Sequence, residues 1–310
     1  MEIKEYKLNF FNQCSPMEGE FGCSLIGCST EEKWYGDDVD FQTTFKYPVR
    51  GRLLTGDYDE VIEQANSVKD VTTAKYAILF FTKTDDENAF MRRLKEVMPE
   101  LIVVGGTAAN YIEGNKTLFT PGMIALLLIE DDRYEITTEC MCMHEEVLET
   151  MEVIPTSRRS FEDVIINGET VKFKDVLDKY RAIKGVTELE QLPLDQFTIN
   201  DGRNLHVLWG DTPEQFKVGT DFIEGLTKDM TFRWASPELV TDRIKAFYED
   251  EDCLYFTCGA LRRLLLLDGR YPLTKSGSLG LFLYGEVTTI DGRSEFSNLM
   301  IAKMKFVPKA

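Results

Sequence analysis

Apolar and polar positions along the chain form blocks whose period changes between that of a helix and that of a strand. Val61, Ile62, Ala65 and Val68 recur at helical spacing behind an acidic first turn, which predicts a helix. The next block, 76–82, is a continuous apolar and aromatic run bounded by polar residues. Such a run is typical of a central strand that is covered on both faces.

The same order continues and then returns in the last third of the chain. Next we expect a helix that is capped near Thr84 or Asp85, is apolar on one side over 90–98 and stops at Pro99, and then a strand over 101–104 that ends in two glycines. A second series begins with a helix that opens at Ser236 and Pro237. Buried strands over 253–257 and 279–284, with a short helix between them over 261–267, complete that series, and further strands are expected over 123–129 and 299–306.

This repetition predicts an α/β (α+β) protein of two related halves, each a mixed β-sheet flanked by helices, which arose by internal duplication. We expect an N-terminal arm or layer of short strands over 1–50, one half over 51–171 and the other over 172–310. A helix from Phe173 to Tyr180 and a strand over 205–209 are expected between the repeated series, with a polar surface connection over 184–201.

Length and charge narrow the class of protein. The 310 residues are 43% hydrophobic, which provides ample material for buried cores and excludes intrinsic disorder. The net charge of −18 would repel phosphate backbones and anionic lipid surfaces, so we expect neither a nucleic acid nor a membrane as partner. No apolar run approaches the ~20 residues of a membrane-spanning helix.

The N-terminus and the cysteines indicate a cytoplasmic protein. Residues 1–5 have neither the basic start nor the apolar core of a secretory signal. The 7 cysteines are an odd set with no regular spacing, and we interpret them as reduced thiols.

Several segments resemble the FIST family, whose paired N- and C-terminal domains are sensory modules of signalling proteins. In the C-terminal half they are Phe256–Cys258, the run from Gly280 through Tyr284 to Glu286, and Phe296–Asn298. In the N-terminal half they are the strand 76–82, the turn at 104–107 and the segment 154–168. The resemblance covers about residues 57 to 306.

The resemblance implies a cytoplasmic sensor that binds a small ligand, for which amino acids have been suggested, and that performs no chemistry. It implies no cofactor, although some FIST-like proteins are haem-based sensors of nitric oxide. Such a receptor would signal through a downstream protein. Binding would shift the balance between two arrangements of the halves or of a homodimer.

The ends of the strands supply the first candidate ligand residues. Gly105, Gly106 and Gly285 end strands in the two halves, where glycine permits a positive φ or a close approach to the backbone. Both uses suit a ligand crevice at the carboxyl ends of strands. The alternative is that these glycines form tight turns that the fold requires. Thr107 would add a neutral hydrogen bond to a ligand or to a turn.

A charged clamp is expected next to these glycines. Glu286 ends an apolar strand, where a carboxylate is costly to bury unless it is paired. It could receive the ammonium group of a zwitterionic ligand while Arg262 holds the carboxylate, with Asn298 and Tyr284 nearby. A structural Arg–Glu pair is the open alternative.

Two alternatives to an amino acid sensor involve cysteine residues. Cys258 follows a buried strand and precedes an expected helix, where a thiolate would be stabilised, but no base for a thiol-dependent enzyme is apparent and a small buried apolar role is preferred. Cys140, Cys142 and His144 would share one face of a strand and could, with His206, hold a metal or haem. A straight strand would separate Cys140 from His144 by about 13 Å, too far for both to reach one ion, so no metal is expected. His206 is interpreted as a core or edge residue.

Overall fold

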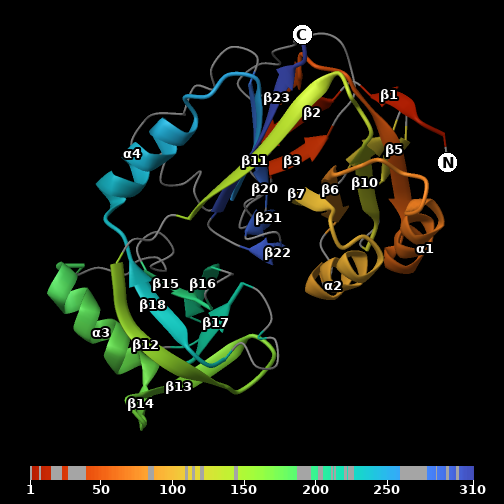
Figure 1. Cartoon of the computed structure of the whole chain (residues 1–310). Coiled ribbons are helices and arrows are strands. Elements are labelled where there is room, and N and C mark those ends of the chain that lie inside the picture. The colour runs from red at the N-terminus through yellow and green to blue at the C-terminus, as the bar shows by residue number, and fades with distance from the viewer. Residues whose placement is uncertain are drawn as a thin grey trace. The chain divides into compact units, whose positions relative to one another are not determined.

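A computed structural model gives the fold of the chain (Figure 1). The structure describes a set of segments that covers most of the chain, namely residues 2–6, 8–14, 23–26, 40–82, 87–108, 111–113, 116–118, 122–142, 146–186, 197–201, 205–210, 212, 214–219, 222, 227–258, 278–283, 285–290, 293–297 and 300–310. They form an α+β structure, mostly strand, with three larger β-sheets of mixed and antiparallel type and four helices.

The chain divides into two compact units. The first comprises Met1–Met141, Lys245–Phe296 and Met300–Ala310, and the second comprises Cys142–Ile244 with Ser297–Leu299. The boundary expected at residue 171 falls inside the second unit, between strand β14 (Glu169–Lys172) and helix α3 (Phe173–Lys184). The boundary expected at residue 50 falls inside strand β5 (Val49–Gly56) of the first unit.

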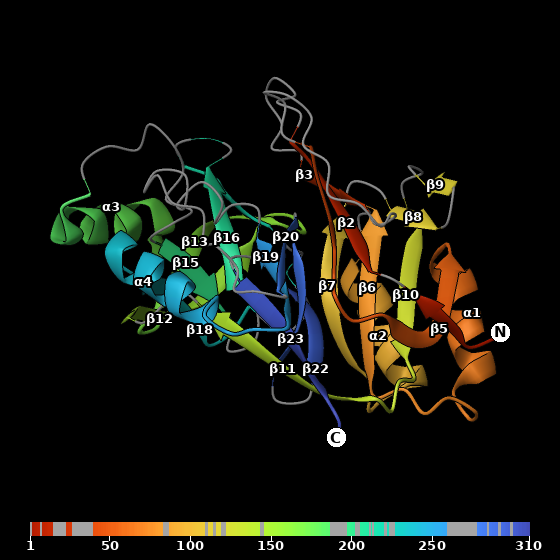
Figure 2. The same ribbon diagram turned by 90° about the horizontal axis from the view of Figure 1, so that it is seen from above.

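The first unit contains a seven-stranded mixed sheet, in which β7, β6, β10 and β5 lie side by side (Figure 2). β6 and β7 are parallel, whereas β10 is antiparallel to both β5 and β6. The order across the sheet is β1 (Lys4–Tyr6), β5, β10 (Ile124–Ile129), β6 (Tyr76–Thr82), β7 (Ile102–Ala108), β21 (Glu286–Ile290) and β22 (Arg293–Ser297).

Two helices cover one face of this sheet, as their apolar periodicity predicts. α1 (Tyr58–Val68) begins with a capping box between Asp57 and Glu60, and its residues Val61, Ile62, Ala65 and Val68 are buried. α2 (Glu87–Val97) buries Phe90 and Leu94, and both helices pack on Leu79 and Leu126 of the sheet. The cap expected near residue 85 lies outside the described residues.

The other face of the sheet packs against a second, four-stranded sheet. Its order is β11 (Tyr134–Cys142), β23 (Met300–Pro308), β19 (Cys253–Cys258) and β20 (Leu279–Leu283), with β19 parallel to β20 and antiparallel to β23. Ile78 and Leu127 of the first sheet meet Phe256 and Met304 of the second in one apolar layer. The runs at 76–82 and 124–129 are therefore apolar throughout because both of their faces are buried.

Two small sheets belong to the same unit. One has the order β3 (Cys23–Ile26), β2 (Asn9–Cys14), β4 (Asp40–Thr44), and the other pairs β8 (Tyr111–Glu113) with β9 (Lys116–Leu118). The described part of residues 1–50 thus forms short strands, one of the two arrangements expected for it.

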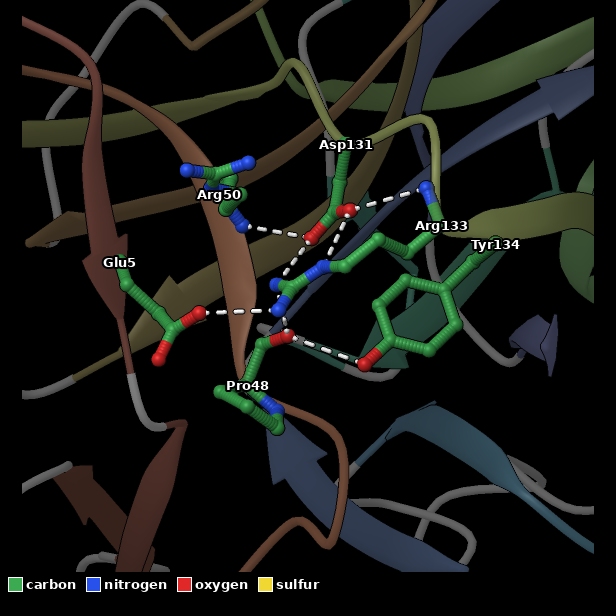
Figure 3. A network of polar contacts seen from close by, with 6 residues as sticks. All are labelled: Glu5, Pro48, Arg50, Asp131, Arg133 and Tyr134. Carbon is green, nitrogen blue, oxygen red and sulfur yellow. Dashed lines mark hydrogen bonds and ion pairs between the residues drawn. The ribbon is translucent and has the colours of Figure 1, made fainter. Parts of the chain in front are cut away.

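A polar network holds strand β1 and the turn after β10 to the start of β5 (Figure 3). Arg133 donates to both carboxylate oxygens of Asp131, to Glu5 and to the carbonyl of Pro48. Burial by itself raises the pKa of Asp131, but hydrogen bonds from the Arg133 side chain and from the backbone N–H groups of Arg50 and Arg133 outweigh it and lower that pKa.

The second unit is an antiparallel sheet with helix α3 and most of helix α4 (Pro237–Phe247). Its strands are β12 (Glu146–Pro155), β18 (Met230–Trp234), β15 (Phe197–Asn200), β16 (Leu205–Gly210), β17 (Phe216–Val218), β13 (Ser160–Ile166) and β14, in that order, and β12 also pairs with β13. Six strands therefore close into a ring around a phenylalanine-rich core, against which α3 packs. Phe232 in this core contacts the rings of Phe173 and Phe197.

Most of the expected elements that fall on described residues are confirmed, with two differences. The surface connection expected over 184–201 is wrong at its end, because Phe197–Asn200 is the fully buried strand β15. The strand expected over 101–104 does not stop at Gly105 but runs on to Ala108, since β21 pairs with its end. Helix α4 (Pro237–Phe247) agrees with the expectation, whereas the helix expected over 261–267 lies outside the described residues.

Candidate functional site

Glu286 is the first residue of β21 and lies inside the first unit. It pairs with Gly106 of β7, and Val287 pairs with Gly105. Val287 packs in the core beneath the helices, so the alternation of side chains along the strand directs Glu286 to the other face, toward the second sheet. The residue is 0% exposed.

Among the residues that the structure describes, the groups that face this carboxyl are uncharged. The thiol of Cys258, at the end of β19, and the backbone N–H of Met300, at the start of β23, face it. Neither carboxyl oxygen has a hydrogen-bond partner with acceptable geometry among the residues that the structure describes. Burial raises the pKa of Glu286 well above its ordinary value, and the N–H of Met300, the thiol of Cys258 and the backbone N–H of Glu286 itself offset only part of that shift.

Such a group requires an explanation. A buried polar atom without a partner costs roughly 1–3 kcal/mol, and nearly all such atoms in proteins are bonded to protein, water or ligand. The carboxyl also lies where the carboxyl ends of two parallel strand pairs meet, β6 with β7 and β19 with β20. In open α/β sheets this end is where ligands bind.

The three glycines of the expected crevice have close-packing roles within the protein. Gly105 (φ +139) and Gly106 (φ +157) occupy backbone conformations that favour glycine. A Cβ atom on Gly105 would lie 1.9 Å from the carbonyl oxygen of Leu79, and one on Gly106 would lie 2.1 Å from that of Gly285. A Cβ atom on Gly285 would lie 2.0 Å from the ring of Phe296. The close approach inferred from the sequence is therefore made by neighbouring parts of the chain.

Thr107 does not join Glu286. It follows Gly106 in β7, and its partner in the neighbouring strand is Phe81, whose side chain packs beneath the helices. Strand alternation therefore places Thr107 on the helical face. Its N–H donates to the carbonyl of Gly285 at 2.9 Å, while its buried Oγ1 has no hydrogen-bond partner in the described structure.

Cys258 is brought to Glu286, but the cationic half of the expected clamp is not seen. Cys258 is 2% exposed and, like Cys140 and Cys253 among the described cysteine side chains, forms no disulfide. Arg262, Tyr284 and Asn298 lie outside the described residues. No described lysine or arginine forms an ion pair with Glu286.

The alternative metal site gains no ligand set within the described segments, where no group of three His, Cys, Asp or Glu side chains is arranged to hold an ion. Cys140 belongs to the first unit and His206 to the second, the side chain of Cys142 is not described, and His144 lies outside the described residues. His206 is a buried residue of β16 whose Nε2 lies 3.2 Å from Oδ2 of Asp201. Its expected role as a satisfied core residue is confirmed.

Sequence reasoning missed two contributors to the site. Met300 acts through its backbone N–H, for which no side chain gives a signal. Tyr248 hydrogen-bonds to Thr257, a neighbour of Cys258, inside the protein. Burial raises the pKa of Tyr248, the bond to Thr257 opposes this, and the charge of Glu286 adds to it. Tyr248 is therefore close enough to Glu286 to sense its ionisation.

No protein-family model matches the chain, and no curated protein is similar to it in sequence. The resemblance to the FIST family therefore stays a prediction. None of the described helices has the length and apolar character needed to span a membrane.

Proposed function

We propose that the first unit is a sensory domain that binds a small polar metabolite, of the amino acid class, at Glu286 and does not transform it. One observation carries the proposal: Glu286 is 0% exposed, and its oxygens lack hydrogen-bond partners within the described structure. A ligand that reaches this carboxyl would supply the missing partner. The resemblance of the surrounding segments to the FIST family supports the same class of function.

The finer fold proposal, internal duplication, is supported by the order of strands in the two sheets of the first unit. The order β5-β10-β6-β7 in one sheet corresponds to β11-β23-β19-β20 in the other. In both, a parallel pair ends at the candidate site and an antiparallel strand flanks the pair. The main segment of the second unit would then be an insertion that begins at the end of β11 and finishes within α4.

Signalling would follow from differential binding. If the chain exchanges between two arrangements, the ligand shifts their ratio only by the ratio of its affinities for them. A downstream protein, in the cytoplasm, would read the favoured arrangement. In a homodimer, the ligand could shift the ratio of two arrangements of the subunits in the same way.

A thermal-shift panel of the standard amino acids tests the binding proposal. A ligand at 100 times its Kd adds about 2.7 kcal/mol of stability, which for a protein of this size raises Tm by several degrees, at about 2–4 °C per kcal/mol. Glu286→Gln should abolish the shift.

Glu130→Gln is the matched control. Glu130 is also nearly buried, with 3% of its side chain exposed, but it is paired with Arg52 at 2.6 Å, so this variant should retain the ligand response. A panel with no response in the wild-type protein, or a response retained by Glu286→Gln, would contradict the proposal.

A second candidate function rests on the contact between Cys258 and Glu286. A thiol that faces a carboxyl group could lose its proton to it once the carboxyl is ionised, which is the nucleophile–base pair of a thiol-dependent enzyme. Alkylation by iodoacetamide tests this, with Cys253 as the buried internal control. Cys258 should react faster than Cys253 and lose that advantage in Glu286→Gln, and equal slow labelling of both thiols would remove this candidate.

A further inference from the structure

We infer that Glu286 exchanges its proton for the primary ammonium group of the ligand, so that each binding event releases one proton and affinity rises with pH. This inference rests on the proposed function, which by itself requires neither a cation nor a proton. The described groups that face the carboxyl and the close packing of its backbone support it.

The groups around Glu286 favour a neutral carboxyl when the site is empty. β7 presents Gly106, β20 presents Leu283, β19 presents the Cys258 thiol and β23 presents the backbone N–H of Met300. The chain beyond α4 adds the phenol of Tyr248, which is uncharged at neutral pH. Among the described residues, nothing supplies a charge that would compensate a carboxylate here, and an uncompensated buried charge is unfavourable.

Close backbone packing holds Glu286 at this position. The strand that carries it is held against β7 so closely that a Cβ atom on Gly106 would lie 3.1 Å from Cα of Glu286. The N–H of Thr107 also donates a hydrogen bond to the carbonyl of Gly285, which precedes Glu286 in the chain. Since no described side chain neutralises the carboxyl group, we expect a proton or a bound cation to do so in place.

A primary ammonium group satisfies both requirements. It carries one positive charge and three N–H donors, and an ionised carboxyl group offers two acceptor oxygens. In the exchange the carboxyl O–H bond breaks, its proton passes to the solvent, and N–H···O bonds form between ligand and carboxylate. The site is neutral before and after the exchange, and nothing is oxidised or reduced.

The chemistry of the chain disfavours an anion as the group at Glu286. The protein has an excess of 18 acidic side chains over basic ones, which attracts cations and repels anions. A neutral hydroxyl could hydrogen-bond to the protonated carboxyl, but it would release no proton. Proton release therefore separates an ammonium from a hydroxyl at the same position.

Methylammonium chloride is the first probe because it carries only the proposed group. Thermal unfolding is followed in methylammonium chloride and in sodium chloride at equal ionic strength, between about pH 5 and pH 8. We expect methylammonium to raise Tm more than sodium does, by an amount that grows with pH, in the wild type and in Glu130→Gln but not in Glu286→Gln. Equal effects of the two salts at every pH would overturn the inference.

The amino acid that gives the largest thermal shift provides the second probe. Calorimetric titration in two buffers of different ionisation enthalpy counts the protons exchanged. We expect one proton released per ligand, a Kd that falls about tenfold per pH unit while the carboxyl is protonated, and weaker binding of the hydroxy acid of the same side chain.

The two proposals fail differently. Binding without proton release, with a Kd independent of pH, would overturn the exchange and leave the proposed function standing. Absence of binding by every amino acid would overturn the proposed function, whatever methylammonium does.

Discussion

At the scale of single residues, Glu286 combines complete burial with a position held by close backbone packing. Its neighbours are a thiol, a backbone N–H group and glycine, and none of these can stabilise a carboxylate fully. Functional groups in proteins often carry such a cost, because a site that is fully satisfied without ligand gains little by binding one.

Glu286→Gln is expected to stabilise the protein at neutral and alkaline pH. The folded state binds the carboxyl proton more tightly than the unfolded chain, where glutamate titrates near 4.5. The carboxyl therefore destabilises the fold progressively as pH rises above that value, by about 1.4 kcal/mol per pH unit up to the folded-state pKa. Glutamine keeps the shape without this penalty.

Denaturant unfolding at a series of pH values measures this effect. The advantage of Glu286→Gln should vanish as pH falls below about 4.5, where the carboxyl becomes protonated in the unfolded chain as well. Glu130→Gln, which loses its bond to Arg52, should instead destabilise by about 1.5–3 kcal/mol at neutral pH. A wild type that is more stable than Glu286→Gln at pH 8 would show that the carboxylate has a partner.

Gly106→Ala tests the close packing beside Glu286. The added Cβ would lie 2.1 Å from a backbone oxygen, at a φ of +157, so the strands β7 and β21 would have to separate. We expect a loss of more than about 3 kcal/mol. In the control Gly168→Ala, with φ +85 and no atom within 4 Å of the added Cβ, only the backbone conformation is disfavoured, by about 1–2 kcal/mol. Equal losses measured by denaturant unfolding would contradict the packing.

At the scale of elements, the residues that the sequence could place are those whose environment is local. The runs at 76–82 and 124–129 are apolar because both faces are covered, and they are strands with almost the expected bounds. The helices α1 and α2 were predictable because each has one apolar face, at helical spacing, that packs on the sheet.

The elements that escaped prediction depend on distant partners. β7 continues through Gly105 and Gly106 because β21, far along the chain, supplies its second row of hydrogen bonds. β12 is irregular against both neighbours, with shifts of register between Val147 and Glu149 and between Ile154 and Pro155. Such bulges break the alternation that would have revealed the strand. At the site, Glu286 could be proposed from its place after an apolar run, but its surroundings depend on groups from four other strands, β7, β19, β20 and β23.

Asp131→Asn tests the network that holds β1 and β5 together. The low pKa of Asp131 means that its ionised form stabilises the fold above about pH 4 and that this contribution is lost as pH falls through the folded-state value. Because Arg133 is 39% exposed, we expect a modest loss of about 1–3 kcal/mol at neutral pH.

The difference between Asp131→Asn and wild type should shrink as pH falls from neutral toward acid, when followed by denaturant unfolding. Asp59→Asn is the control, since the pair of Asp59 with Arg93 is solvent-exposed and contributes at most about 0.5 kcal/mol. A loss for Asp131→Asn that does not depend on pH would indicate that packing, and not charge, is responsible.

At the scale of the whole molecule, each unit has its own core, so we expect two separable unfolding steps. Phe232 is fully buried in the second unit, against Phe173 and Phe197, and Phe232→Ala should cost about 3–5 kcal/mol in that unit. Phe90, fully buried beneath the first sheet, is its counterpart in the first unit.

Scanning calorimetry of the full chain distinguishes the steps. Phe232→Ala should lower one transition and Phe90→Ala the other. The response to an amino acid ligand should follow the transition that Phe90→Ala lowers, since Glu286 belongs to that unit. A single transition that both variants shift equally would show that the two cores unfold as one.

The ionisation of Glu286 is the property on which the whole account depends, and the ¹³C resonance of its carboxyl carbon reports it directly. The signal is assigned by its absence in Glu286→Gln and is followed against pH in the ligand-free protein. We predict a midpoint well above the ordinary value of 4.5, which falls when a ligand with an ammonium group is added. A midpoint near 4.5 in the free protein, unchanged by any amino acid, would contradict the account.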